Sequence, residues 1–163
     1  MTMAVSVTQL HRMAQGDEDA ADEIWRAIGP MNGWHPFGQW VVGAIYHPPT
    51  VTRGGLLLPD HSMSRATHGA QGMSTHLSHR LEGKAFMLLT HGPEAFPEKL
   101  LPRWAGRQPE IGSWFFAMAR DGVEISLDFG GEKSDRVEGR GWPCRIFQAD
   151  DIMGPIPHPG CLV

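Results

Sequence analysis

Four of the nine histidines in this 163-residue sequence fall in one polar stretch, and they are its best candidates for chemistry. They are His61, His68, His76 and His79. In a helix, the His76-x-x-His79 spacing would place two imidazoles on one face, as in some metal sites. No cysteine is near, and Glu82 is the only carboxylate within reach. We therefore interpret the stretch as a solvated, histidine-rich loop and predict no metal site.

The remaining reactive side chains have simpler interpretations. Asp150-Asp151 precedes the apolar pair Ile152-Met153, which favours turn or cap chemistry over an acid/base pair. Cys144 lies in an apolar run and is interpreted as a packed core thiol. Nucleophile-elbow, phosphate-loop, H-E-x-x-H and C-x-x-C motifs are missing from the sequence. The sequence therefore predicts neither an enzyme nor a cofactor.

Composition narrows the classes of partner. The net charge of −4 gives no general attraction to nucleic acid or to anionic lipid, and the aromatic residues are not interleaved with basic ones. No apolar stretch approaches the length of a membrane span, and the first residues do not resemble a signal peptide. Cys144 and Cys161 make no disulfide framework. A cytoplasmic protein that binds neither nucleic acid nor membrane is expected.

The N-terminal residues are expected to be helical. The apolar residues follow helical spacing, and Gly16 is expected to divide the helix in two, with acidic residues 17–19 opening the second piece. The "GPMNGWHPFG" stretch, residues 29–38, is expected to end the helix and act as a linker. The stripe comprises Val7, Leu10, Ala14, Ala21, Ile24, Trp25 and Ile28.

From Trp40 onward the sequence favours strands. Runs at 39–47 and 83–92 are apolar on both faces, as buried strands are. Residues 111–131 are expected to form a hairpin that turns at Asp121-Gly122, and residues 143–156 a last strand with a short turn. One helical turn is expected near Glu98 to Leu101. Short strands, 20 glycines and 13 prolines favour a small mainly β barrel.

One tripeptide needs an explanation of its own. Leu56, Leu57 and Leu58 follow Gly54-Gly55 directly, in the stretch "YHPPTVTRGGLLLPD". One interpretation is a glycine turn followed by a buried strand. The other is that a loop presents the three leucines to a partner.

The β segments, taken in order, resemble the GroES-like co-chaperonins, the chaperonin-10 family. "VVGAIYHPPTVTRGGLLLPD" is similar to the family's early strand, its threonine-containing loop and its Gly-Gly followed by three aliphatic residues. "FMLLTHGPEAF", "IGSWFFAMARDG" and "CRIFQADDIMGPI" are similar to its later strands, in the same order. The "GPEAF" and "PCRIF" variants look most like bacteriophage and prophage members.

This resemblance implies a fold and a partner. It implies a GroES-like β-barrel over residues 34–163, preceded by a helical arm and linker over residues 1–33. Residues 48–60 correspond to the family's mobile loop, and 61–82 to a long loop. Gly54, Gly55 and Leu56–Leu58 would then bind a chaperonin of the host or the phage, with the protein acting as an oligomeric lid in the bacterial cytoplasm.

A structural role in a virion is the alternative. A GroES-like barrel could serve as a capsid decoration or connector protein, with the helical arm and extended loops contacting capsid proteins. The N-terminal extension, the longer 61–82 loop and the tail "PHPGCLV" favour this second interpretation.

Overall fold

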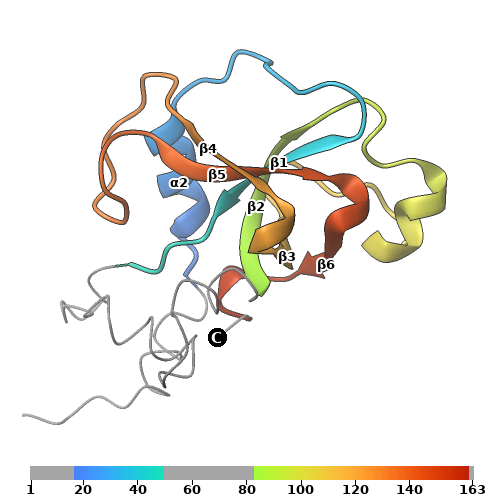
Figure 1. Cartoon of the computed structure of the whole chain (residues 1–163). Coiled ribbons are helices and arrows are strands. Elements are labelled where there is room, and N and C mark those ends of the chain that lie inside the picture. Colours follow the sequence, from blue (N-terminus) through green and yellow to red (C-terminus); the bar gives the residue numbers. More distant parts are fainter. Residues whose placement is uncertain (1–16, 50–82, 162–163) are drawn as a thin grey trace, which may run out of the picture.

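The computed structural model describes residues 17–49 and 83–161, and in this part of the chain the protein is mainly β. Six strands form one antiparallel sheet in the order β4-β5-β1-β2-β3-β6 (Figure 1). The mainly β class predicted from the sequence is confirmed. The strands are β1 (Trp40–Ile45), β2 (Gly83–His91), β3 (Trp114–Met118), β4 (Val123–Leu127), β5 (Trp142–Gln148) and β6 (Ile152–Ile156).

Helix α2 (Ala20–Ile28) is the second of the two predicted helical pieces. Asp19 is its N-cap and Gly29 its C-cap, so both predicted limits are confirmed. Ile24 and Ile28 are fully buried, and they pack with side chains of β1, β2 and β5. The described part of the N-terminal arm therefore packs on the sheet of its own chain. The first helical piece lies outside the described residues, and the domain boundary at residues 33/34 stays a prediction.

The central strands β1 and β2 are buried on both faces, as their apolar runs predicted. Val42 and Ala44 of β1 join the cluster under α2, whereas Val41 belongs to a second cluster on the other face. In β2, Met87 and Phe86 divide between the two clusters in the same way. This is the alternation that a pleated strand imposes on successive side chains.

The predicted hairpin at Asp121-Gly122 is wrong. Strand β3 pairs with β2 and β6, and β4 pairs with β5 at the other edge of the sheet. A two-residue hairpin turn of the type that Asp-Gly favours needs positive φ at both residues, but Gly122 has φ −107°. A short 3-10 turn, η2 (Ala119–Asp121), instead carries the chain across the molecule.

The C-terminal segment contains two strands where one was predicted. Strand β5 pairs with β1 and β4, the turn η3 (Ala149–Asp151) follows it, and β6 then pairs with β3. Asp150 and Asp151 lie in η3, so their interpretation as turn residues is confirmed. The helical turn expected near Glu98 is η1 (Glu98–Trp104). A last short turn, η4 (Pro159–Cys161), closes the described chain.

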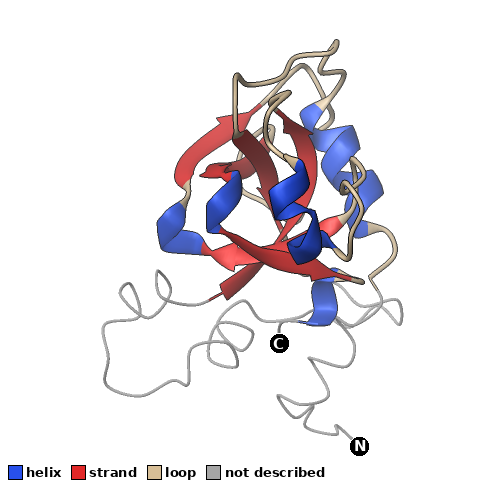
Figure 2. Cartoon of the chain, turned by 90° about the vertical axis from the view of Figure 1, so that its right-hand side faces the viewer, coloured by secondary structure: helices blue, strands red, loops and turns tan. Residues whose placement is uncertain are grey.

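The sheet is strongly curved (Figure 2). Strands β3 and β5 are three strand spacings apart in the sheet, about 14 Å if it were flat. Phe115 of β3 and Phe147 of β5 nevertheless lie with ring centroids 5.9 Å apart, and both contact Phe86 of β2. The sheet therefore wraps around these three rings. No pairing joins β4 to β6 among the described residues, so a closed barrel is not seen.

Candidate functional site

The residues predicted to bind a partner lie outside the described part of the chain. These are Gly54, Gly55, Leu56, Leu57 and Leu58, and the same holds for His76 and His79. What the structure defines is the place where the 50–82 segment joins the sheet, which we call the loop root: residues 45–49 and 83–86.

The loop root lies at one end of the two central strands. Ile45 of β1 is opposite Phe86 of β2, and the Tyr46 backbone N–H donates to the Ala85 carbonyl at 2.9 Å. The chain thus leaves β1 and returns in β2 next to it. Segment 50–82 connects two adjacent antiparallel strands, and the described sheet forms without any strand from it.

A buried ionic cluster holds the loop root. We call it the Arg136 cluster; its members are Asp17, Glu23, Tyr46 and Arg136. The Arg136 guanidinium donates to both carboxylate oxygens of Asp17, and its Nε lies 3.2 Å from Glu23 Oε2. The Tyr46 hydroxyl donates to Asp17 Oδ2 at 3.2 Å. Three charged side chains and a phenol from three distant segments therefore share one network.

Arg136 also contacts the root directly, because its Nη1 donates to the His47 carbonyl at 3.1 Å. Its own segment is tied to α2 by Ser134, whose hydroxyl donates to Glu23 Oε2 at 3.0 Å. The Tyr46 ring packs edge-on against Trp114 of β3, with centroids 5.8 Å apart. The first described residues, the loop root and the 131–137 segment are consequently fastened together (Figure 1).

Burial decides the electrostatics of the cluster. The side chains of Arg136 and Asp17 are only 5% and 7% exposed. Burial alone would lower the pKa of Arg136, but hydrogen bonds and the charge of Asp17 raise it above its usual value. Burial, followed by the charge of Asp17, raises the pKa of Tyr46 well above its ordinary value, so the phenol stays a donor. Arg136 and Tyr46 therefore both act as hydrogen-bond donors in the cluster, which serves as an anchor.

Sequence reasoning missed the Arg136 cluster. Asp17 was assigned only to the start of a helix, and Arg136 carried no local pattern. The two residues are 119 positions apart, so no short-range spacing could have linked them.

Of the reactive side chains considered above, Cys144, Asp150 and Asp151 lie in the described residues. The Cys144 thiol is buried and donates to the Trp142 carbonyl at 3.3 Å, which confirms the core interpretation. Burial raises its pKa to about 12, so almost no thiolate is present at neutral pH. Within residues 17–49 and 83–161, no three His, Cys, Asp or Glu side chains gather as metal ligands would. In the same residues, no helix is long and apolar enough to cross a membrane.

Comparison with known proteins identifies no family for this chain. No protein-family model matches the chain, and no curated protein matches its sequence.

Proposed function

We propose that this protein is a co-chaperonin-type lid, without enzymatic activity, whose Leu56–Leu58 tripeptide binds a chaperonin ring. The observation that carries the proposal is the position of the segment bearing the tripeptide. It connects the two central strands β1 and β2, which pair directly with each other at an anchored root. We infer that this segment serves a partner instead of the core.

The curved sheet supports a GroES-like barrel as the fold. Contact between Phe115 and Phe147 across β1 and β2 requires the curvature of a small barrel wall. Gly43 of β1 lies in the middle of this wall, where a Cβ would come within 2.7 Å of the Phe115 ring. The interior is thus filled with aromatic side chains, as in small barrels that hold no ligand.

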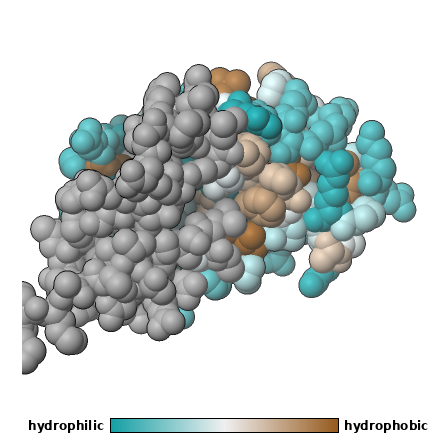
Figure 3. All heavy atoms as spheres, turned by 60° about the horizontal axis from the view of Figure 1, so that its bottom comes forward, coloured by the Kyte–Doolittle hydropathy of each residue, from teal (hydrophilic) through white to brown (hydrophobic). Residues whose placement is uncertain are grey.

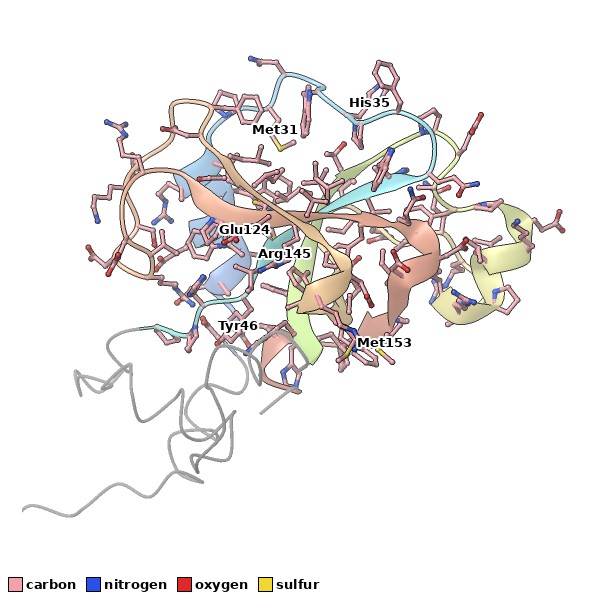
Figure 4. All side chains as sticks on the ribbon, viewed as in Figure 1. Met31, His35, Tyr46, Glu124, Arg145 and Met153 are labelled. Carbon is pink, nitrogen blue, oxygen red and sulfur yellow. The ribbon has the colours of Figure 1, made fainter. Side chains whose placement is uncertain are left out.

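The face around the loop root suits a docking role. Hydrophobic residues gather on its described part (Figure 3). Met153 of β6 lies at this end of the molecule and is 54% exposed (Figure 4). A partner that binds Leu56–Leu58 would meet apolar surface next to it.

The balance between leucine burial and loop ordering favours binding to the chaperonin as an oligomer. Burying three leucines contributes roughly 5–9 kcal/mol per copy before costs. Ordering a loop of a dozen residues at about 1–2 kcal/mol each could cancel all of it. Each contact would be weak alone, and a homo-oligomer would bind through the high effective concentration of its other copies.

Native mass spectrometry with a bacterial chaperonin and ADP tests the proposal. We expect a closed oligomer that adds to the chaperonin as a unit, and no addition for Leu57→Asp with an unchanged melting temperature. Val123→Asp is the matched control, because Val123 is a 62% exposed apolar residue of β4, outside the segment. Wild-type protein that ignores the chaperonin contradicts the lid function, and a large loss of thermal stability in Leu57→Asp supports a buried strand.

A virion structural protein is the second candidate. It is favoured by exposed apolar side chains at the end of the sheet away from the loop root, where Phe37 is 87% exposed and Trp40 38%. A capsid decoration or connector protein uses such surfaces against capsid proteins. Co-purification with assembled particles, and loss of it in Phe37→Ser, would support this function over the lid.

A further inference from the structure

A hollow of about 420 Å³ opens between the 29–35 segment, α2 and the end of β2. We call it the two-tryptophan hollow; the residues used below are Trp25, Trp34, His35, His91 and Ile111. His91 is opposite Val41 in the β1–β2 pairing, at the far end from Ile45 and Phe86. The hollow is therefore remote from the loop root. Met31, which also lines it, and His35 lie together above the sheet in Figure 4.

The walls of the hollow are held in place without a ligand. The Trp34 backbone N–H donates to the Met31 carbonyl at 3.0 Å, and its carbonyl accepts from Thr90 Oγ1 at 3.2 Å. The Trp34 ring contacts Phe129, with centroids 6.1 Å apart. Pockets that bind small molecules are usually preformed in this way and of this size.

The two histidines that line the hollow share one tautomer. His35 Nδ1 lies 2.9 Å from the Pro36 carbonyl, and His91 Nδ1 lies 2.8 Å from the Gly92 carbonyl. A carbonyl only accepts, so Nδ1 carries the proton in each ring and Nε2 of the neutral ring is an acceptor. Gln108 Nε2, at 3.5 Å from His91 Nε2, is a donor and fits this tautomer.

Charge selects the class of ligand. No lysine or arginine lines the hollow within the described residues. Three exposed charged residues adjoin lining residues along the chain: Glu94 and Glu110 beside Pro93 and Ile111, and Arg26 beside Trp25, which leaves one net negative charge. Indole faces attract cations, and tryptophan does so best among the aromatic side chains. Two indoles, one unshared nitrogen acceptor and chain neighbours that are negative on balance are complementary to a positively charged donor.

We propose that the two-tryptophan hollow binds a small organic cation that carries an alkylammonium or guanidinium group. The indoles of Trp25 and Trp34 contact the cation, and Nε2 of His35 accepts an N–H group where it has one, whereas Nε2 of His91 accepts from Gln108. A metal ion is a poorer fit. Two imidazoles line the hollow with no thiolate or carboxylate, whereas zinc sites take three or four protein ligands.

Isothermal titration calorimetry with choline, and separately with N-acetylarginine amide, tests this proposal. The neutral isostere of choline, 3,3-dimethylbutan-1-ol, is the matched ligand control. We expect saturable binding of at least one cation, about tenfold tighter than the neutral alcohol, since a cation–π contact contributes about 0.5–2 kcal/mol. Equal affinity for choline and the alcohol would overturn the proposal, as would the lack of saturable binding by either cation.

Paired variants locate the site. Trp34→Leu should weaken cation binding about tenfold, whereas Trp40→Leu should not. Trp34 and Trp40 are 40% and 38% exposed, but Trp40 does not line the hollow.

If Trp34→Leu fails to fold, the indole N–H resonances of the wild-type protein show which tryptophans the cation contacts. Shifts of Trp25 and Trp34 on choline addition support the site, and shifts confined to other tryptophans overturn it. Zn²⁺ that binds tighter than choline and displaces it would make the hollow a metal site instead.

Discussion

At the scale of single residues, burial removes reactivity from the only thiol whose environment is described. Cys144 has a pKa of about 12 because desolvation disfavours the thiolate. Below pH 9, the ordinary pKa of a thiol, the raised pKa leaves the free energy of unfolding unchanged. Above pH 9 the free energy of unfolding falls, because the thiol ionises in the unfolded state before it does so in the native state.

We therefore expect Cys144 to react with a disulfide reagent only through unfolding. In a Cys161→Ser background at pH 8, the rate of modification should equal the rate of global unfolding and rise with denaturant. A reaction as fast as that of a free thiol would show that Cys144 is accessible in the native protein.

Asp151 is a second residue whose surroundings oppose its charge. Burial, then the negative charges of Asp121 and Asp150, raise its pKa above the ordinary 3.8. The native state thus binds the proton more tightly than the unfolded state. Stability from this group is present when Asp151 is protonated and is lost as the pH rises through 3.8 and beyond.

Asp151→Asn should consequently raise the melting temperature at pH 7 by a small amount. The same substitution should have little effect at pH 3, where the wild-type carboxyl is largely protonated. Thermal melts at pH 7 and pH 3 check this. An equal change in melting temperature at both pH values would mean that the substitution acts through packing and not through charge.

At the scale of elements, β1 depends on a glycine at its centre. The register of the β1–β2 pairing shifts between Val42 and Gly43, and a Cβ on Gly43 would lie 2.7 Å from Phe115 Cζ and 2.9 Å from Phe86 Cβ. The inner rings can occupy this space only because Gly43 has no side chain.

Gly43→Ala should destabilise the protein by about 1–3 kcal/mol through overpacking. Gly83→Ala is the matched control within β2, since among the described residues its Cβ would meet nothing closer than 3.6 Å. Urea unfolding measures both free energies. Similar decreases in the free energy of unfolding for the two variants would mean that the aromatic core rearranges to accept the extra methyl group at Gly43.

The Arg136 cluster joins three segments, and removing its cation leaves the buried Asp17 carboxylate without its countercharge. Arg136→Met should reduce the free energy of unfolding by about 3–5 kcal/mol, as for other broken buried ion pairs. Arg140→Met, at an exposed arginine that makes no contact with the cluster's carboxylates and donates to the Gly131 carbonyl, should change it by less than about 0.5 kcal/mol. A loss below 1 kcal/mol in Arg136→Met would show that the loop root holds without the cluster.

At the scale of the whole molecule, the sheet and the 50–82 segment are separable in the topology. Adjacent strands β1 and β2 need only a short connection at Tyr46 and Ala85, where their backbones are already hydrogen-bonded. Replacing residues 50–82 by a four-residue turn should keep the fold. A shorter connection should also add up to about 2 kcal/mol of stability from loop-closure entropy.

Circular dichroism and urea unfolding of this deletion variant measure the effect. A folded variant that no longer binds chaperonin would fit the proposed lid. An unfolded variant would show that residues 50–82 are part of the core, which would contradict the separation of sheet and segment.

The sequence by itself determined what depends on neighbours along the chain. Apolar runs located β1 and β2, Asp19 and Gly29 limited α2, and the apolar surroundings of Cys144 identified a core thiol. These features follow from local backbone preference and from the periodicity of burial, which short windows record. The β6 strand was missed because Gly154 and Pro155 weaken its pattern.

Only the tertiary structure decided which strands pair and which charges meet. The Asp121-Gly122 dipeptide favours a hairpin locally, yet β4 gains more by pairing with β5 while Phe147 fills the interior beside Gly122. Arg136 and Asp17 meet across 119 positions because the curved sheet and α2 bring their segments together. Strand pairing and buried ion pairs depend on contacts distant in sequence, and no local spacing encodes them.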